Sequence, residues 1–299
     1  MTKEIDYSEE DTPRAYIAMS DRLVLFPHSK TSSAVWDMED DRCLGVLDGH
    51  NSGICWASIN NIEKAAVTVG DADRIDVHSI KIWNLETVQC TSNLTTTSYL
   101  PPAAMLLKDR LLLGSEDGFI KVWDIGGSTP VALMDLEGHT YNVLSIDALD
   151  SSNIALSGSR DESLRLWDLR TGQCVRVMEG HAGWVSSVSM DSACKTAVSG
   201  SDDETVKLWD LGSGQCIKTY EHGLAVCDVM MHESGSSFLS CGYCCDVKAW
   251  ATASGSNQLL LDADLGKVFP DLLHSMHFAA SRDLSKVAAC HRYAVSIWA

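Results

Sequence analysis

Residues 138–216 contain one unit written twice. The first copy reads GHTYNVLSI (138–146), SGSRDESLRLWDL (157–169) and TGQC (171–174). The second copy reads GHAGWVSSV (180–188), SGSDDETVKLWDL (199–211) and SGQC (213–216). Four landmarks keep the same spacing of 42 residues, namely the pairs 139/181, 161/203, 167/209 and 174/216. Self-similarity at a fixed period indicates a fold assembled from repeated structural units.

Beyond these two copies, tryptophans end a series of short runs in which apolar residues alternate with polar or small ones. They are Trp36, Trp83, Trp123, Trp167, Trp209, Trp250 and Trp298. Alternation with a period of two is typical of a β-strand that buries one face. In the clearest unit we expect four strands, at residues 185–190, 196–199, 205–210 and 216–220. Seven matching runs therefore predict seven small sheets.

A period of about 40–45 residues with Gly-His and Trp-Asp landmarks resembles the WD40 repeat. The resemblance implies an all-β fold, a seven-bladed β-propeller with four-stranded antiparallel blades, spanning residues 13–299. The seventh blade would lack a fourth strand, because the chain stops at Ala299. WD40 propellers commonly use the N-terminal segment to close the ring. We therefore expect residues 3–8, within an acidic segment 1–12, to pair with the strand around Trp298.

The composition narrows the classes of partner. The 299 residues carry a net charge of −18, which disfavours binding to nucleic acid and to anionic membranes. The 11 cysteines are odd in number, and no apolar run resembles a signal peptide or a membrane span. Free thiols and a cytoplasmic location are expected, with the nucleus left open. Cys241, Cys244 and Cys245 include a Cys-x-x-Cys spacing without a second ligand pair, so no metal or cofactor is predicted, although a redox or metal role stays open.

Two sets of side chains invite comparison with a hydrolase triad: His139, Ser157 and Asp161, and His181, Ser199 and Asp203. The WD40 resemblance implies a different role. In that family such residues form a hydrogen-bonded chain with the strand tryptophan, here Trp167 and Trp209 respectively. A catalytic nucleophile would occur once, beside an oxyanion hole, whereas this set occurs twice at the repeat spacing. We therefore predict a structural network and no enzyme, with Ser159 and Ser201 as alternative serines on the same strand face.

The other units carry only part of this set. The second keeps His50, Thr68 and Trp83, with the acid supplied by Asp71, Asp73 or Asp76, and the sixth keeps His222, Ser240 and Trp250 but has Cys244 in place of the acid. The first, third and seventh units have at most two members, so apolar packing should hold them together. Trp56, two residues after Ile54, is expected in the core.

Candidate partner-binding residues follow from the resemblance as well. In WD40 proteins, partners often contact the residue three positions after each loop histidine and the residue before each turn aspartate. Here the first rule gives Gly53, Asn142, Trp184 and Ala225, and the second gives Arg160 and Asp202. We select Tyr141, Asn142, Arg160, Trp184 and Asp202, because an aromatic beside an arginine is typical of an interface hot spot. The alternative for Trp184 is that it merely covers the end of its blade.

These observations favour a non-enzymatic scaffold that binds other proteins or peptides, as a monomeric propeller within a larger hetero-complex. The alternative is a reader of a short or modified motif at the channel mouth, for example substrate recognition for a ubiquitin ligase. A phosphorylated motif would need several cations there. A basic peptide bound by the carboxylates of Asp161, Asp202 and Asp203 fits the net charge of −18 better.

Overall fold

The structure is a computed structural model. It describes residues 2–6, 16–60, 64–73, 77–96, 103–127, 129–242, 247–254, 257–261, 277–281, 283–291 and 294–298. Every labelled element in this part of the chain is a β-strand, so the protein is all-β. No helix among these residues has the length and hydropathy needed to cross a bilayer.

Six antiparallel sheets are each built from four strands that follow one another in the chain. The first two sheets contain β2 (Ala18–Met19), β3 (Leu23–Pro27), β4 (Ser32–Asp37), β5 (Arg42–Asp48), β6 (Ile54–Ile59), β7 (Ala65–Asp73), β8 (Val77–Asn84) and β9 (Gln89–Thr96). The next two contain β10 (Ala103–Leu106), β11 (Arg110–Gly114), β12 (Ile120–Asp124), β13 (Val131–Leu136), β14 (Val143–Leu149), β15 (Ile154–Ser159), β16 (Leu164–Asp168) and β17 (Gln173–Met178). The last two contain β18 (Val185–Met190), β19 (Thr196–Ser201), β20 (Thr205–Asp210), β21 (Gln215–Glu221), β22 (Val226–Met231), β23 (Ser237–Gly242), β24 (Val247–Ala251) and β25 (Asn257–Leu261).

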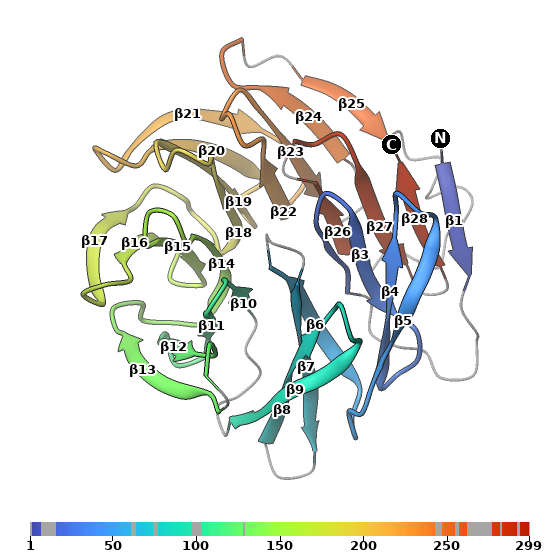
Figure 1. Ribbon diagram of the computed structural model, residues 1–299. Helices are drawn as coiled ribbons and strands as arrows, with labels where there is room; N and C mark the ends of the chain where they lie inside the picture. Colours follow the sequence, from blue (N-terminus) through green and yellow to red (C-terminus); the bar gives the residue numbers. More distant parts are fainter. Residues whose placement is uncertain are drawn as a thin grey trace.

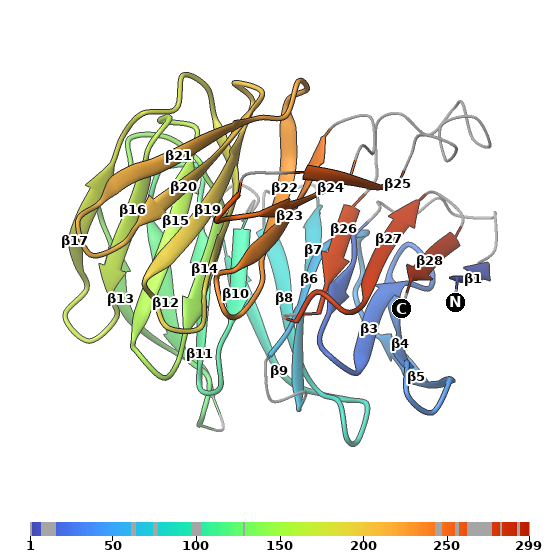
Figure 2. The same cartoon turned by 90° about the horizontal axis from the view of Figure 1, so that it is seen from above.

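A further sheet joins the two ends of the chain. Its strand order is β1 (Thr2–Asp6), β28 (Ala294–Trp298), β27 (Val287–His291) and β26 (His277–Ala280). β1 and β28 are antiparallel, with Thr2 opposite Trp298 and Asp6 opposite Ala294. The two termini accordingly lie side by side in both views (Figures 1 and 2).

The sheets are arranged around a common centre, with β14, β18 and β22 nearest to it and β13, β17 and β21 on the outside (Figure 1). The first strands of successive sheets contact one another: β10 contacts β14, β14 contacts β18, and β18 contacts β22. In the view turned by 90°, the strands of the sheet β14–β17 run between two faces of the molecule (Figure 2). One face carries the loops that lead into β14, β18 and β22, and the other carries the turns that follow these strands.

The hydrophobic core lies between neighbouring sheets. Trp167 of β16 is fully buried in one cluster with Leu112 and Val122 of the preceding sheet. Trp209 of β20 is likewise buried in one cluster with Leu156, which belongs to the preceding sheet. Each sheet thus buries apolar side chains from both of its faces, which explains why strands such as β15 and β19 are buried along most of their length.

The strand predictions for the clearest unit hold closely. The ranges 185–190 and 205–210 match β18 and β20, whereas β19 and β21 each extend beyond the predicted ends. Trp56, predicted as a core residue, packs against a core cluster that includes Val67 and Val69, but its side chain stays partly exposed and lines a central cavity. The pairing of β6 with β7 shifts register between Ile54 and Trp56. Such a bulge breaks the period-two rule and turns Trp56 toward the centre.

Candidate functional site

The repeated polar network is formed in the sheet β18–β21. His181 lies in the loop before β18, and its Nε2 is 2.7 Å from Oγ of Ser199 on β19. Nδ1 of His181 is 2.7 Å from Oδ2 of Asp203, which lies in the turn between β19 and β20. The indole Nε1 of Trp209 donates to Oγ of Ser199 at 2.8 Å. Two of these bonds therefore meet on one buried serine, and His181 links that serine to Asp203.

The sheet β14–β17 has the same arrangement with the same distances. His139 bridges Ser157 and Asp161, each at 2.7 Å, and Trp167 Nε1 donates to Ser157 Oγ at 2.8 Å. The serines of the network are thus the first of each Ser-Gly-Ser, while Ser159 Oγ instead donates to the carbonyl of Tyr141. All donors and acceptors are used when each histidine is neutral and carries its proton on Nδ1.

The surroundings favour that protonation state. Burial lowers the pKa of His181, and the hydrogen bond and charge of Asp203 oppose this only in part. Burial also acts to raise the pKa of Asp203, but the backbone N–H of Ala182, the hydroxyl of Thr205 and the ring of His181 outweigh it and lower the pKa to about 2. The network therefore holds a neutral imidazole beside an ionised carboxylate at neutral pH.

The connectivity from serine to histidine to aspartate is that of a hydrolase triad, but the setting differs. Ser157 and Ser199 are both 0% exposed, so a substrate has no access to either hydroxyl. Each serine oxygen also accepts the indole N–H, a bond that holds it in the core. The geometry supports a network that satisfies buried polar groups and ties a loop and a turn to the sheet.

The remaining sheets show graded versions of the network. In the sheet β6–β9, Thr68 Oγ1 accepts from Trp83 Nε1 at 2.8 Å and lies 2.7 Å from His50 Nε2. Nδ1 of His50 lies 2.8 Å from the hydroxyl of Ser79, a partner that the sequence did not single out. The side chains of Asp71, Asp73 and Asp76, which were the predicted acids, lie outside the described residues.

Two further sheets depart from the complete network. In β22–β25, Trp250 Nε1 donates to Ser240 Oγ at 2.7 Å. The ring centroids of His222 and Trp250 are 6.5 Å apart. Cys244, which stands in place of the acid, lies outside the described residues. In β10–β13, Leu113 takes the place of the serine. The buried Nε1 of Trp123 consequently has no hydrogen-bond partner in the described part of the chain.

Cys43, Cys90, Cys174, Cys216 and Cys227 are free thiols. Cys241 is buried in β23, while Cys244 and Cys245 lie outside the described residues. Within the described ranges, no group of three or more His, Cys, Asp or Glu side chains is placed to hold a metal ion. Four of the thiols have a recurring place: each lies opposite the tryptophan of the neighbouring strand, in the pairs Trp36/Cys43, Trp83/Cys90, Trp167/Cys174 and Trp209/Cys216.

The five candidate partner-binding residues lie at the face where the loops enter β14 and β18. The Arg160 guanidinium lies over the Trp184 ring, 4.3 Å from its centroid, and so bridges two neighbouring sheets. Backbone bonds hold the pairs together, from Arg160 N to Asn142 O at 2.9 Å and from Asp202 N to Trp184 O at 3.0 Å. We call Tyr141, Asn142, Arg160, Trp184 and Asp202 the loop-face patch.

The loop-face patch presents aromatic surface to solvent. Tyr141 is 63% exposed and Trp184 is 45% exposed, although both are large apolar side chains. Burial raises the pKa of Asp202, and the positive charge of Arg160 opposes that rise. The expectation that Asp161 and Asp203 would offer carboxylates to a ligand needs correction. Both are nearly buried and bonded to a histidine, a loop N–H and a turn hydroxyl, which leaves Asp202 as the accessible acid.

Comparison with known proteins gives the same picture of the central repeats. The family described as "WD domain, G-beta repeat" matches residues 130–168 and 172–210. Autophagy-related protein 16 of Arabidopsis thaliana is 26% identical over 156 residues, covering 52% of this chain and 30% of that protein. Nuclear distribution protein PAC1 of Arthroderma benhamiae is 30% identical over 168 residues, covering 49% of this chain and 36% of that protein.

A third relative, mitochondrial division protein 1 of Neosartorya fischeri, is 28% identical over 148 residues, covering 48% of this chain and 20% of that protein. The matched part thus spans about a third or less of the length of these relatives. Their names refer to different cellular processes. The similarity therefore identifies a type of repeat and leaves the pathway of this chain open.

Proposed function

We propose that this chain, a member of the WD40-repeat family, is a non-enzymatic interaction scaffold that joins a larger protein complex as a single copy. WD40 proteins generally serve as protein-interaction scaffolds and are typically not catalysts. The observation that carries the proposal for this chain is the exposed Trp184 with Arg160 over its ring. The loop-face patch is the proposed contact surface, and the cytoplasm is the proposed location.

The physical case rests on what a partner would gain at this surface. An indole that is nearly half exposed offers a large apolar area, whose removal from water is worth about 25 cal/mol per Å². Tryptophan, tyrosine and arginine are the residues enriched in interface hot spots. Arg160 is held in place by Trp184 and adds directional hydrogen-bond donors, so less side-chain entropy is lost on binding.

For the architecture, we propose a closed propeller of seven blades over residues 13–299, completed by the N-terminal strand within the acidic segment 1–12. The pairing of β1 with β28 supports closure, as do the contacts of β26 with both β2 and β22. Closure removes the open edge that β28 would otherwise present. Deletion of residues 1–10 should lower the unfolding midpoint, and an unchanged midpoint would count against closure.

The experiment that tests the scaffold function compares affinity-purified complexes of the wild type and a W184A/R160E variant by mass spectrometry. A matched control, I217A/R176E, changes an exposed aliphatic residue and an exposed arginine on the outer strands β21 and β17. The free energy of unfolding of each variant should lie within about 1 kcal/mol of the wild-type value. The exposed cation–π pair lost in W184A/R160E contributes about 0.5–1 kcal/mol, and the control changes only exposed side chains.

We expect at least one protein to be lost from the W184A/R160E complex and retained by the I217A/R176E control. The same set of proteins from all three forms would rule out the loop-face patch as the contact surface. The alternative, a reader of short basic motifs, is supported by the acid Asp202 next to Trp184. A lost partner that also binds through one short peptide would favour the reader, and one that needs its folded domain would favour the scaffold.

A further inference from the structure

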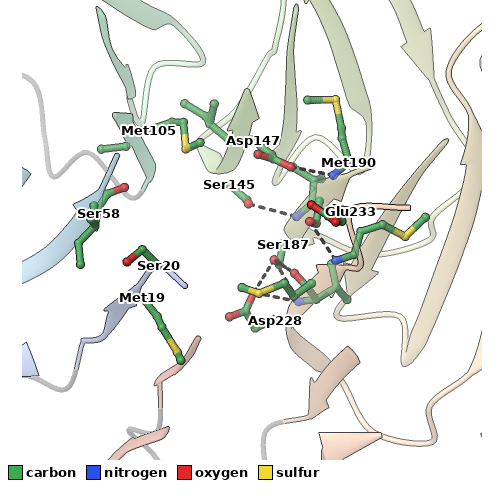
Figure 3. Close-up of a pocket in the computed structure, with 18 of the residues that line it drawn as sticks. Met19, Ser20, Ser58, Met105, Ser145, Asp147, Ser187, Met190, Asp228 and Glu233 are labelled. Atoms are coloured by element: carbon green, nitrogen blue, oxygen red, sulfur yellow. Dashed lines mark hydrogen bonds between the residues drawn. The ribbon is translucent and has the colours of Figure 1, made fainter. Parts of the chain in front are cut away.

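A cavity of about 290 Å³ lies at the centre of the molecule, and none of the loop-face patch residues lines it. Its walls are the inner strands β6, β10, β14, β18 and β22, and it reaches Asp21 and Glu233, which follow the ends of β2 and β22 (Figure 3). Trp184, in contrast, immediately precedes β18. Because a six-residue strand is roughly 17 Å long, the cavity and the loop-face patch lie toward opposite ends of the inner strands.

The charged side chains among the described residues of the cavity wall all have one sign. Four acidic residues contribute to its wall: Asp21, Asp147, Asp228 and Glu233. Among the described residues that line it, none is lysine, arginine or histidine. Lys286 approaches from outside, and its Nζ donates to the backbone carbonyl of Asp21 at 2.5 Å. Low-dielectric walls of one sign concentrate the field inside such a space and attract a group of opposite charge.

Asp228 is the central acid of the cavity. Its Oδ1 accepts from Ser187 Oγ at 2.6 Å and from the backbone N–H of Val229 at 2.8 Å. No donor from the described residues reaches its Oδ2. Burial raises the pKa of Asp228 to about 6, so the carboxylate is short of favourable partners in the protein alone. A bound cation would supply the missing partner.

The other acid with a described bond is fixed in place by a neighbouring sheet. Oδ2 of Asp147 on β14 accepts the backbone N–H of Met190 on β18 at 2.7 Å. Ser145 and Ser189 make equivalent bonds to the backbones of Val188 and Met231. These bonds between inner strands hold the cavity wall rigid, which suits a preformed site.

Besides several serines, the rest of the described wall is apolar and adaptable in shape. Trp56 lines the cavity together with the five methionines Met19, Met105, Met190, Met230 and Met231. Thioether side chains adapt to the shape of an aliphatic chain, and an indole face attracts cations. A volume of about 290 Å³ is at the lower limit of about 300–1,000 Å³ for small-molecule sites, so it suits one side chain rather than a whole cofactor.

We propose that this cavity binds one arginine or lysine side chain of a partner protein, with the cationic head at Asp228 and the aliphatic stem against Trp56 and the methionines. The carboxylates, the apolar wall and the size of the cavity each fit that ligand. This second site is independent of the loop-face patch. A scaffold with both sites would hold partners at both ends of its inner strands.

The test uses short capped peptides as probes and the methionines as reporters. With ¹³C-methyl-methionine labelling, the full-length protein gives one signal for each of its 10 methionines, five of which line the cavity. The probes are acetyl-Ala-Arg-Ala-amide and acetyl-Ala-Lys-Ala-amide. Their uncharged counterparts carry citrulline and acetyl-lysine at the central position.

We expect a charged peptide to shift the signals of the cavity methionines while Met38, Met134 and Met178 stay unchanged. D228N, which keeps an acceptor for Ser187, should weaken binding about tenfold or more, since hydrogen bonds to charged groups are worth about 1.5–3 kcal/mol. E179Q removes an exposed carboxylate instead and should change affinity less than about twofold. W184A/R160E should bind these peptides with the same affinity as the wild type. The cavity and the loop-face patch can therefore be tested independently of each other.

Three results would overturn the proposal: no shift with either charged peptide at 10 mM, about equal shifts with the uncharged counterparts, or an equal loss of affinity in D228N and E179Q. The last would indicate nonspecific attraction to a protein of net charge −18. Unchanged signals of Met38, Met134 and Met178 in free D228N show that the variant is folded, so a loss of binding then reports on the site.

Discussion

The sheets β18–β21 and β10–β13, which are separated by the sheet β14–β17, place a tryptophan at the equivalent position but treat its indole N–H differently. In the first, Ser199 accepts the indole N–H of Trp209 and connects it to His181. In the second, Leu113 lies at the matching register position, and Trp123 Nε1 is buried without a partner in the described residues. Both sheets have four strands, so apolar packing alone is enough to form a sheet of this kind.

The sheet β6–β9 lies between these extremes. It keeps the histidine and a hydroxyl acceptor, but Ser79 rather than an aspartate faces His50 Nδ1. The carboxylate is therefore not required for the bond from tryptophan to hydroxyl to imidazole. What the carboxylate adds is a charge beside the ring and bonds to the loop and turn backbones, as Asp203 shows with Ala182 and Thr205.

The largest effect should come from S199A. The substitution leaves Trp209 Nε1 and His181 Nε2 buried without their shared partner, and each unsatisfied group costs about 1–3 kcal/mol. We expect a loss of about 3 kcal/mol in the free energy of unfolding, measured by urea denaturation. S201A is the matched control on the same strand, and it removes one bond to the backbone N–H of Asp203. Equal losses in the two variants would contradict the special role of the network.

A smaller effect should appear on acidification, and it should be greatest for His50, whose Nδ1 lies 2.8 Å from the hydroxyl of Ser79. Burial, and then the charge of Lys81, lower the pKa of His50 to about 4. Burial also lowers the pKa of His181, but the hydrogen bond and the charge of Asp203 oppose that lowering. Since the folded pKa is below the unfolded value of about 6.5, this stability is complete above pH 6.5 and is lost as the pH falls toward 4. Between pH 7.5 and pH 5, His50 alone should account for a loss of about 2 kcal/mol.

Two acids must be considered in that measurement. Asp203, with its pKa lowered to about 2, loses its stabilising effect only below about pH 4. Asp228, with its pKa raised to about 6, gains a proton in the folded state first and therefore stabilises the fold as the pH falls through 6. Urea titrations in D228N remove that opposing effect. A histidine NMR titration that finds His50 near its ordinary pKa would contradict the prediction.

The smallest effect should separate two tryptophans. W209F removes an indole N–H that has a partner, and W123F removes one that has none among the described residues. We expect W123F to be less destabilising than W209F by about 1–2 kcal/mol, of which about 1 kcal/mol reflects the hydrogen bond. Thermal unfolding of the two variants under one buffer condition provides the comparison. Equal destabilisation would mean that the indole bond contributes nothing measurable.

Much of the architecture could be predicted from local sequence. The strands at 185–190 and 205–210 follow from alternation, because a strand that buries one face must repeat every two residues. Trp56 shows where this reasoning fails. A bulge shifts the parity of β6 by one residue, and no local pattern announces a bulge that depends on pairing with β7.

For the candidate sites, the repeat spacing pointed to the histidines, serines and tryptophans of the networks, since one 42-residue offset relates both copies. It could not identify Ser79 as the partner of His50, because the two are 29 residues apart and meet only across the sheet. From the sequence we also predicted that the carboxylates of Asp161 and Asp203 would be available to a ligand. Folding commits both to a histidine and to backbone N–H groups.

The sequence by itself determined that this protein is made of repeated β-units with a tryptophan at a fixed place, because periodicity and side-chain alternation are local properties. Only the tertiary structure decided which side chains share a space. Arg160 reaches Trp184 across two sheets, and Asp147 and Asp228 line one cavity although 81 positions separate them. The strands β6, β10, β14, β18 and β22 each contribute two to four residues to that cavity wall, so its charge becomes visible only when the sheets are arranged around one centre.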